Sequence, residues 1–295
     1  MSEQPSPELR ACVNHPDTQT YLSCTRCGNP ICPQCLTPAP VGQHCPACVN
    51  AGKRTVRQVR TGLGARPIRR PTATYTLLGL NIVAFVVSMA LGLTNVNDHY
   101  GMWPIGIALN HEYYRLFTSM FLHASLTHIA FNMLVLWIVG QQLESLIGHT
   151  RFVTLYLLSG LAGATASYWF GPVTALAVGA SGAIFGLMGG LLIAGRRLRY
   201  DVTQIAVLIG INIVFSFLWP GVDWRAHLGG LVGGVILGFV FAHAPKKNRV
   251  LFEITLCVLF SAVLVGAIGL RSHQIAISPA VTTGTGASAV STSSR

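Results

Sequence analysis

The chain has 295 residues, of which 51% are hydrophobic and only 10% are charged. Soluble globular domains carry about 25% charged residues, so this composition excludes a protein that faces water along most of its length. The formal net charge of +11 suits an anionic membrane surface, and we expect a lipid bilayer and no nucleic acid as its counterpart.

Residues 1–50 contain seven of the eight cysteines. Pairs of cysteine or histidine separated by two residues occur four times, which gives the eight ligands of two closed tetrahedral sites. So short a segment, with few large apolar residues, could hardly fold without metal. A disulfide framework is the alternative, but seven cysteines would leave one unpaired. We therefore expect two structural zinc ions, with ligands drawn from Cys12, His15, Cys24, Cys27, Cys32, Cys35, Cys45 and Cys48.

This spacing resembles a B-box-type zinc finger across residues 12–48. The resemblance implies interleaved ligand pairs, and His44 could replace Cys45. One ion would then be bound by Cys12, His15, Cys32 and Cys35, and the other by Cys24, Cys27, Cys45 and Cys48. With no spare coordination position, we expect a structural role or the binding of a cytoplasmic protein partner.

Beyond a basic linker at 51–74, which is not expected to pack, the chain is a series of apolar segments. A helix that crosses a bilayer needs about 20 apolar residues. Seven spans are predicted: Tyr75–Leu93, His128–Gly148, Phe152–Phe170, Ser181–Ala194, Val202–Leu218, His227–Ala244 and Leu251–Leu270. The final residues, 272–295, are rich in Ser, Thr, Gly and Ala and are expected to be disordered. The expected fold class is an all-α polytopic membrane protein with a small N-terminal zinc-binding domain.

Lysine and arginine are distributed unevenly between the predicted loops. With the N-terminus inside, the inner loops carry fourteen of them and the outer side three. Because positive charge is retained on the cytoplasmic side, we expect a cytoplasmic N-terminus and a C-terminus outside the membrane.

Two polar residues lie at the start of the second span, in the segment HASLTHIAFN. His128 and Asn132 are four residues apart and share a helix face. Polar side chains at membrane depth also hold helices together, and that role would explain either residue singly. Together they favour a pair of donors directed at a developing oxyanion.

A serine and a histidine begin two glycine-rich spans. Ser181 begins one span, and His227 begins another with Gly230, Gly234 and Gly238 spaced four apart. Such spacing lets a second helix approach closely. If the two helices pack together, Ser181 and His227 come within reach as a nucleophile and its general base. The alternative is that Ser181 is a packing residue.

An acidic third member of a triad is not evident, because the carboxylates on the outer side lie in loops. We expect a Ser-His dyad whose imidazole is oriented by an aromatic ring. Phe185, one helical turn after Ser181, is the candidate, and ordinary core packing is its alternative role.

The segments GASGAIFG, HASLTHIAFN and AHLGGLVGG resemble the three signatures of the rhomboid intramembrane serine proteases, in that family's order. The resemblance covers about residues 75–245 and implies a rhomboid-like helical bundle. It also implies Ser181 as nucleophile, His227 as base, and an oxyanion hole of His128, Asn132 and the Ser181 N–H. The last span, within residues 246–271, would be the additional helix of six-plus-one members.

Other positions support the same resemblance. EYYRLFTSMFLH resembles the family's aromatic-Arg element, with Arg115 after Tyr114 and with His123 as a structural histidine. Gly179 precedes the serine in its signature, and Phe185 stands where many relatives have tyrosine.

The expected function is therefore an intramembrane serine endopeptidase that cleaves transmembrane segments of membrane-protein substrates, with no cofactor for catalysis. One alternative is a non-catalytic rhomboid-like protein that binds transmembrane clients, but such proteins lose the serine or the histidine. Another is a small-solute transporter, but the chain lacks the repeated halves of that class.

Overall fold

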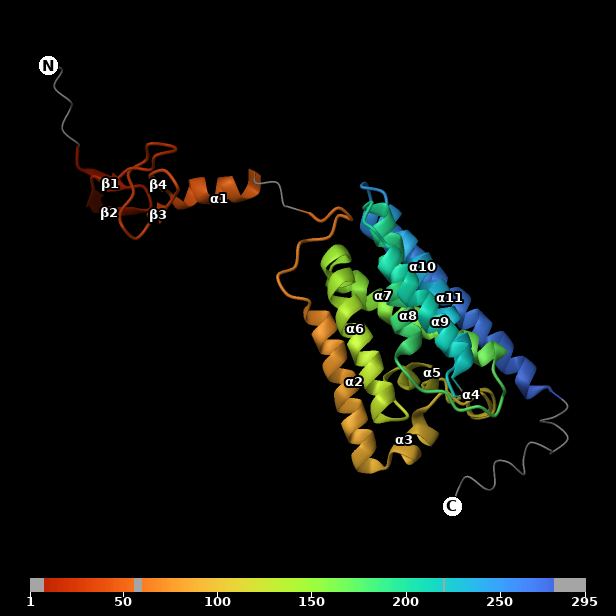
Figure 1. Ribbon diagram of the computed structural model, residues 1–295. Coiled ribbons are helices and arrows are strands. Elements are labelled where there is room, and N and C mark those ends of the chain that lie inside the picture. Colours follow the sequence, from red (N-terminus) through yellow and green to blue (C-terminus); the bar gives the residue numbers. More distant parts are fainter. Residues whose placement is uncertain (1–7, 56–59, 220, 279–295) are drawn as a thin grey trace. The chain divides into compact units, whose positions relative to one another are not determined.

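The computed structural model describes residues 8–55, 60–219 and 221–278 (Figure 1). The chain divides into two compact units, residues 1–59 and 60–295. Each unit has its own buried core.

The first unit is built from two small antiparallel hairpins and one helix. Its elements are β1 (Arg10–Cys12), β2 (His15–Thr20), β3 (Thr37–Pro38), β4 (Gln43–His44) and α1 (Pro46–Thr55). The buried residues of its core are one isoleucine, Ile31, and five cysteines: Cys12, Cys24, Cys32, Cys35 and Cys45. A core made mostly of thiols buries too little apolar surface to be stable alone, which agrees with the expectation of a metal-dependent domain.

The regular secondary structure of the second unit is helical over its described residues, with one isolated antiparallel bridge between Met102 and Ala177. Its helices are α2 (Thr72–Leu91), α3 (Leu93–Tyr100), α4 (Pro104–Asn110), α5 (Arg115–Thr118), a 3-10 turn (Ser119–Phe121), α6 (Leu126–Ile147), α7 (His149–Phe170), α8 (Ser181–Arg197), α9 (Thr203–Leu218), α10 (Trp224–His243) and α11 (Arg249–Ala276). Long helices thus occupy all seven predicted spans, and the short helices α3 to α5 form the connection between the first two.

Membrane crossing is clearest for the helices with the most exposed apolar surface. By length and composition, α2, α6, α10 and α11 can each cross a bilayer, and α9 is a shorter apolar helix. The remaining two, α7 and α8, are more enclosed by protein, so their composition is set by helix packing and not by lipid. The protein is a multi-pass membrane protein.

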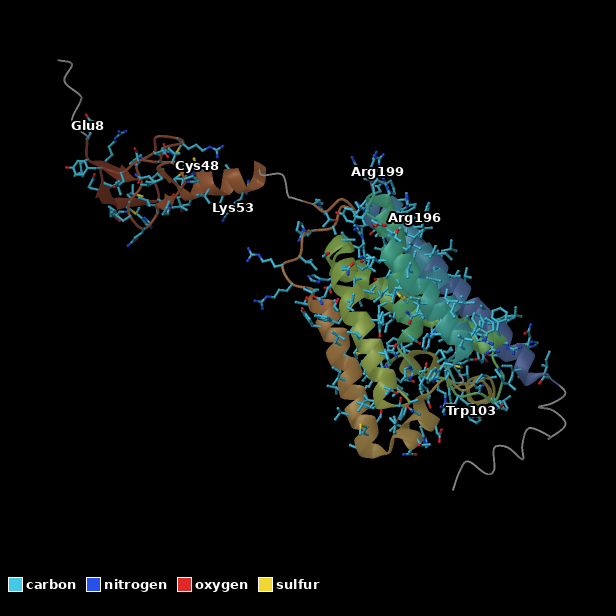
Figure 2. The ribbon with its side chains drawn as sticks, in the orientation of Figure 1. Glu8, Cys48, Lys53, Trp103, Arg196 and Arg199 are labelled. Carbon is cyan, nitrogen blue, oxygen red and sulfur yellow. The ribbon has the colours of Figure 1, made fainter. Side chains whose placement is uncertain are left out.

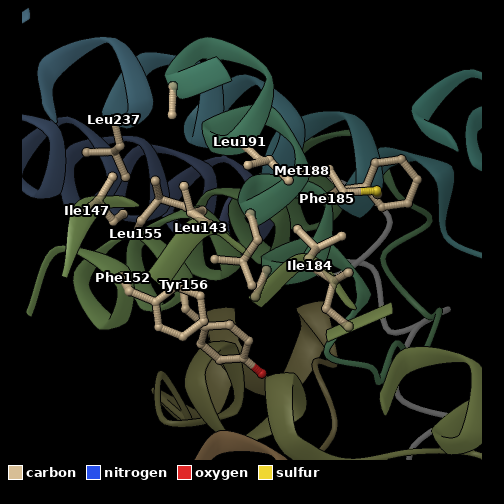
Figure 3. Close-up of a cluster of buried hydrophobic side chains, with 14 of the residues drawn as sticks. Leu143, Ile147, Phe152, Leu155, Tyr156, Ile184, Phe185, Met188, Leu191 and Leu237 are labelled. Atoms are coloured by element: carbon tan, nitrogen blue, oxygen red, sulfur yellow. The ribbon is translucent and has the colours of Figure 1, made fainter. Parts of the chain in front are cut away.

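Helix α8 is the centre of this unit. Residues 182–191 are buried without interruption, and α8 contacts α6, α7, α9 and α10. A helix that is apolar on all sides is enclosed by others. Around it, the core contains Leu143, Leu155, Tyr156 and Leu237 (Figure 3).

Two predicted boundaries were wrong. The linker was not expected to pack, but Leu63 is buried and Thr61 donates a hydrogen bond to the carbonyl oxygen of Leu146. At the C-terminus, α11 continues to Ala276 because the Ser272 hydroxyl lies 2.8 Å from that of Tyr168 and Ile275 is buried. The rest of the predicted disordered tail, 279–295, lies outside the described residues.

The loops predicted to be cytoplasmic lie at one end of the second unit. Arg151 donates hydrogen bonds to the carbonyl oxygen of Leu63 and to Glu253. Arg196 and Arg199 also lie at this end, and Trp103 lies at the opposite end (Figure 2).

Candidate active site and metal centres

Ser181 is the first residue of α8 and is reached through non-helical backbone. Before it, Met102 and Ala177 form an antiparallel bridge, and the Gly179 N–H donates to the carbonyl oxygen of Ser119 at 2.9 Å. Gly179 has φ +144°, a conformation that side chains with a β-carbon rarely adopt. These contacts hold Ser181 at the N-terminus of a buried helix, where its backbone N–H has no partner within the helix.

The structure brings Ser181 and His227 together. His227 Nε2 lies 2.7 Å from Ser181 Oγ, and the imidazole is only 8% exposed. The glycines of α10 make this possible, because a β-carbon on Gly230 would lie 1.9 Å from the carbonyl oxygen of Gly182. The predicted close approach of the two helices is therefore present.

The His227 ring has two further contacts, one against its face and one at Nδ1. Phe185 stacks on His227 with ring centroids 4.3 Å apart and an interplanar angle of 17°. Ser216 of α9 places its Oγ 2.5 Å from His227 Nδ1. The sequence reasoning missed Ser216. The only available signal was its occurrence, one turn after Asn212, as a polar residue within an apolar span.

His128 lies close to the serine, across Gly179. A β-carbon on Gly179 would lie 3.0 Å from His128 Nε2 and 3.5 Å from Ser181 Oγ. His128 Nδ1 accepts a hydrogen bond from the Ala124 N–H at 3.4 Å, so Nε2 carries the proton in the neutral ring. Asn132 lies one turn further along α6 and donates one amide hydrogen to the carbonyl oxygen of His128 at 3.1 Å.

Arg115 connects the short helices beneath the site. Its side chain is 6% exposed and pairs with Glu112 at 2.5 Å. The guanidinium also donates to the carbonyl oxygens of Asp98 at 2.7 Å and Gly101 at 3.1 Å. His123 is fully buried, with its ring centroid 5.1 Å from that of His128. His123 thus lies against His128, and Arg115 joins Glu112 to the backbone at the end of α3.

Comparison with known proteins assigns the family. A family model for the rhomboid domain matches residues 110–244. YdcA of Bacillus subtilis, a member of that family, is 36% identical over 152 residues, which are 50% of this chain and 75% of YdcA. The chain belongs to the rhomboid family.

Two further rhomboid relatives are longer proteins, of which this chain matches only a part. The rhomboid protease GluP of Bacillus subtilis is 37% identical over 217 residues, covering 70% of this chain and 42% of GluP. RHOMBOID-like protein 1 of Arabidopsis thaliana is 41% identical over 144 residues, covering 46% of this chain and 36% of the relative. The chain thus spans less than half the length of these two relatives. The protease names among them place the chain in a family that contains proteases.

Outside the rhomboid domain, the N-terminal unit forms two candidate metal centres. Cys12, His15, Cys32 and Cys35 make up one cluster, and Cys24, Cys27, Cys45 and Cys48 the other. Within each cluster the ligand atoms lie within 4.8 Å of one another. The cysteines are free of disulfides, and His44 is in neither cluster.

Backbone amides support the thiolate form that binds metal. The Cys45 N–H donates to Cys24 Sγ at 3.2 Å, and the Cys48 N–H donates to Cys45 Sγ at 3.3 Å. Burial raises the pKa of Cys24, but hydrogen bonds from the backbone of Cys45, Cys27 and Arg26 outweigh it and lower the pKa to about 6. These hydrogen bonds favour the thiolate of Cys24, which is the form required of a metal ligand.

Proposed function

We propose that this rhomboid-family protein is an intramembrane serine endopeptidase in which Ser181 is the nucleophile and His227 is the general base. The observation that carries the proposal is the 2.7 Å contact between Ser181 Oγ and His227 Nε2, within a multi-pass helical bundle. Relatives named as rhomboid proteases support the same class of reaction.

In the proposed reaction, Ser181 Oγ attacks the carbonyl carbon of a peptide bond while His227 Nε2 takes the hydroxyl proton. His227 then gives that proton to the leaving amine, whose bond to the carbonyl carbon breaks. Water then attacks the acyl carbon while His227 takes its proton. His227 returns that proton to Ser181 Oγ as the bond between Oγ and the acyl carbon breaks, which releases the carboxylic acid and restores the dyad.

The negative charge of the tetrahedral intermediate needs donors that are already in place. Three groups supply them in the proposal. They are His128 Nε2–H, the second amide hydrogen of Asn132, and the Ser181 N–H. The last lies at the N-terminus of α8, where the helix dipole also favours negative charge.

The proposed substrates are transmembrane segments of other membrane proteins. A helix engages its own carbonyl groups in hydrogen bonds, so the substrate has to unwind locally before Ser181 can attack. Cleavage near the outer end of the segment follows from the proposed topology, with a cytoplasmic N-terminus and the C-terminus outside. The common position of the arginine-rich loops at one end of the bundle supports this topology. Reporter fusions at residue 50 and after residue 278 should report opposite compartments, and the same compartment for both would contradict it.

We further propose that each Cys/His cluster binds one zinc ion. Four ligands fill a tetrahedral site, so the ions have a structural role. The domain they stabilise is the proposed binding site of a cytoplasmic protein partner. Elemental analysis of the purified full chain should find two zinc ions per molecule, and none would contradict the assignment.

The catalytic proposal is tested with the full-length protein reconstituted in lipid vesicles together with a single-span substrate. Ser181→Ala should abolish cleavage, because no other group replaces the nucleophile. Ser261→Ala is the matched control, since its hydroxyl bonds only its own helix, at the carbonyl oxygen of Cys257, and it should cleave normally. Equal cleavage by both variants would refute the proposal.

A further inference from the structure

Both ring nitrogens of His227 have a close hydrogen-bond partner: Nε2 contacts Ser181, and Nδ1 contacts Ser216. Ser216 Oγ lies 2.5 Å from His227 Nδ1 and 2.6 Å from the carbonyl oxygen of Asn212. Ser216 is 4% exposed, so solvent does not compete for these contacts. A chain of hydrogen bonds therefore runs from Ser181 on α8, through His227 on α10, to the backbone of α9.

The direction of each hydrogen bond in this chain follows from counting protons. A serine hydroxyl has one hydrogen, and a carbonyl oxygen can only accept. The Ser216 hydroxyl donates to the Asn212 carbonyl and so turns a lone pair toward His227. His227 Nδ1 must then carry the hydrogen, which leaves Nε2 free to accept the proton of Ser181.

Phe185 cannot make this selection. Stacking fixes the plane of the imidazole. However, a 180° rotation about the Cβ–Cγ bond of His227 leaves the ring in the same plane and the stack intact. That rotation exchanges the positions of ring nitrogen and ring carbon. Only a hydrogen-bond partner in the ring plane distinguishes the two orientations, and on the Nδ1 side that partner is Ser216.

Among the described residues, no carboxylate forms a hydrogen bond with His227 Nδ1. Asp223, one turn before His227, accepts hydrogen bonds from the Ser167 hydroxyl and from the Arg225 N–H. It is therefore engaged at the start of α10.

We propose that Ser216 is a positioning residue that holds His227 in the tautomer and orientation required of the general base. This rests on the proposed function and deepens it. Ser216 accepts the Nδ1–H bond before and after His227 takes the proton of Ser181, and Ser216 itself neither gains nor loses a proton. The polar partner of the imidazole is thus a neutral hydroxyl backed by a helix carbonyl.

Substitution of Ser216 tests the proposal through kinetics. Leaving the buried Nδ1–H without an acceptor should lower kcat by about 5- to 100-fold in Ser216→Ala, with KM little changed because no substrate contact is lost. Labelling of Ser181 by a small fluorophosphonate should slow by a similar factor. Ser216→Thr keeps the hydroxyl and its bond to the carbonyl four residues earlier, so it should restore most of both rates.

Ser88→Ala is the matched control. Ser88 is 1% exposed and donates to the carbonyl oxygen of Ala84 at 2.8 Å, but it bonds no histidine. It should leave kcat and labelling unchanged. Wild-type kcat and labelling in Ser216→Ala, or a change in KM alone, would overturn the positioning role. Cleavage by Ser181→Ala would instead overturn the proposed function, so the two failures are distinguishable.

A measurement on the wild-type protein does not depend on how the Ser216 variants fold. Nitrogen-15 chemical shifts of His227, assigned by comparison with His227→Ala, should show a protonated Nδ1 and an unprotonated Nε2 at neutral pH. An unprotonated Nδ1 would overturn the inference.

Discussion

Gly234 of α10 is a position at which one methyl group should separate the two helices that carry Ser181 and His227. A β-carbon there would lie 2.0 Å from the carbonyl oxygen of Gly186 and 2.4 Å from its α-carbon. Both atoms belong to the backbone of α8 and cannot rotate away. Since β-carbon contacts below 3.0 Å essentially do not occur, Gly234→Ala requires α8 and α10 to move apart by about 1 Å.

The change in folding free energy caused by Gly234→Ala has two opposing contributions. Overpacking of a close contact costs about 1–3 kcal/mol, and replacing glycine by alanine within a helix returns about 1 kcal/mol. A small net loss of folding free energy is expected. Activity should fall further, because a displacement of about 1 Å between reacting groups can cost 10²-fold in rate.

The assay compares Gly234→Ala with Gly266→Ala on α11, where a β-carbon would meet nothing within 4 Å. Thermal unfolding in detergent and the cleavage rate are measured for both variants. Gly234→Ala should unfold at a lower temperature and lose most of its activity, and Gly266→Ala should match or exceed the wild type in stability. If the two variants behave alike, the helix contact does not position the site.

Three further substitutions test other parts of the molecule. Phe185→Leu removes the ring stacked on His227; because aromatic pairs contribute about 0.5–1.5 kcal/mol, kcat should fall about 2- to 10-fold, whereas Phe185→Tyr should keep the wild-type kcat. Equal kcat values for the wild type, Phe185→Leu and Phe185→Tyr would show that the ring does not orient His227. Arg115→Ala leaves the Glu112 carboxylate and two backbone carbonyl groups without their hydrogen-bond donor, so the free energy of unfolding should fall by about 2–4 kcal/mol. Chemical denaturation measures this free energy, and an unchanged value would contradict the prediction. Cys24→Ser should reduce the zinc content from two ions to one while Cys257→Ser keeps both, and two ions in Cys24→Ser would argue against the cluster assignment.

The long helices could be predicted from the sequence because apolar length alone defines a bilayer span. The end of α11 could not, because its last turn is held by the contact between Ser272 and Tyr168. That contact joins residues more than a hundred positions apart in the chain, and hydropathy does not record such pairs. Leu63 was missed for the same reason, since its burial depends on helices that follow much later.

The approach of Ser181 and His227 was predictable because the glycines that permit it are regularly spaced. Ser216 was not predictable. A serine inside an apolar helix commonly bonds the carbonyl four residues earlier, as Ser88 does, and nothing local distinguishes the one that also meets a histidine. Which residue of α9 faces His227 depends on helix rotation, which the weakly periodic sequence of α9 does not specify.

The most direct test of the central claim is the mass of the Ser181 peptide after the full-length protein has reacted with a fluorophosphonate. A nucleophile activated by His227 should give one covalent adduct, located on Ser181, and the adduct should be lost or form far more slowly in His227→Ala. Absence of an adduct on Ser181, or equal labelling with and without His227, would contradict the account.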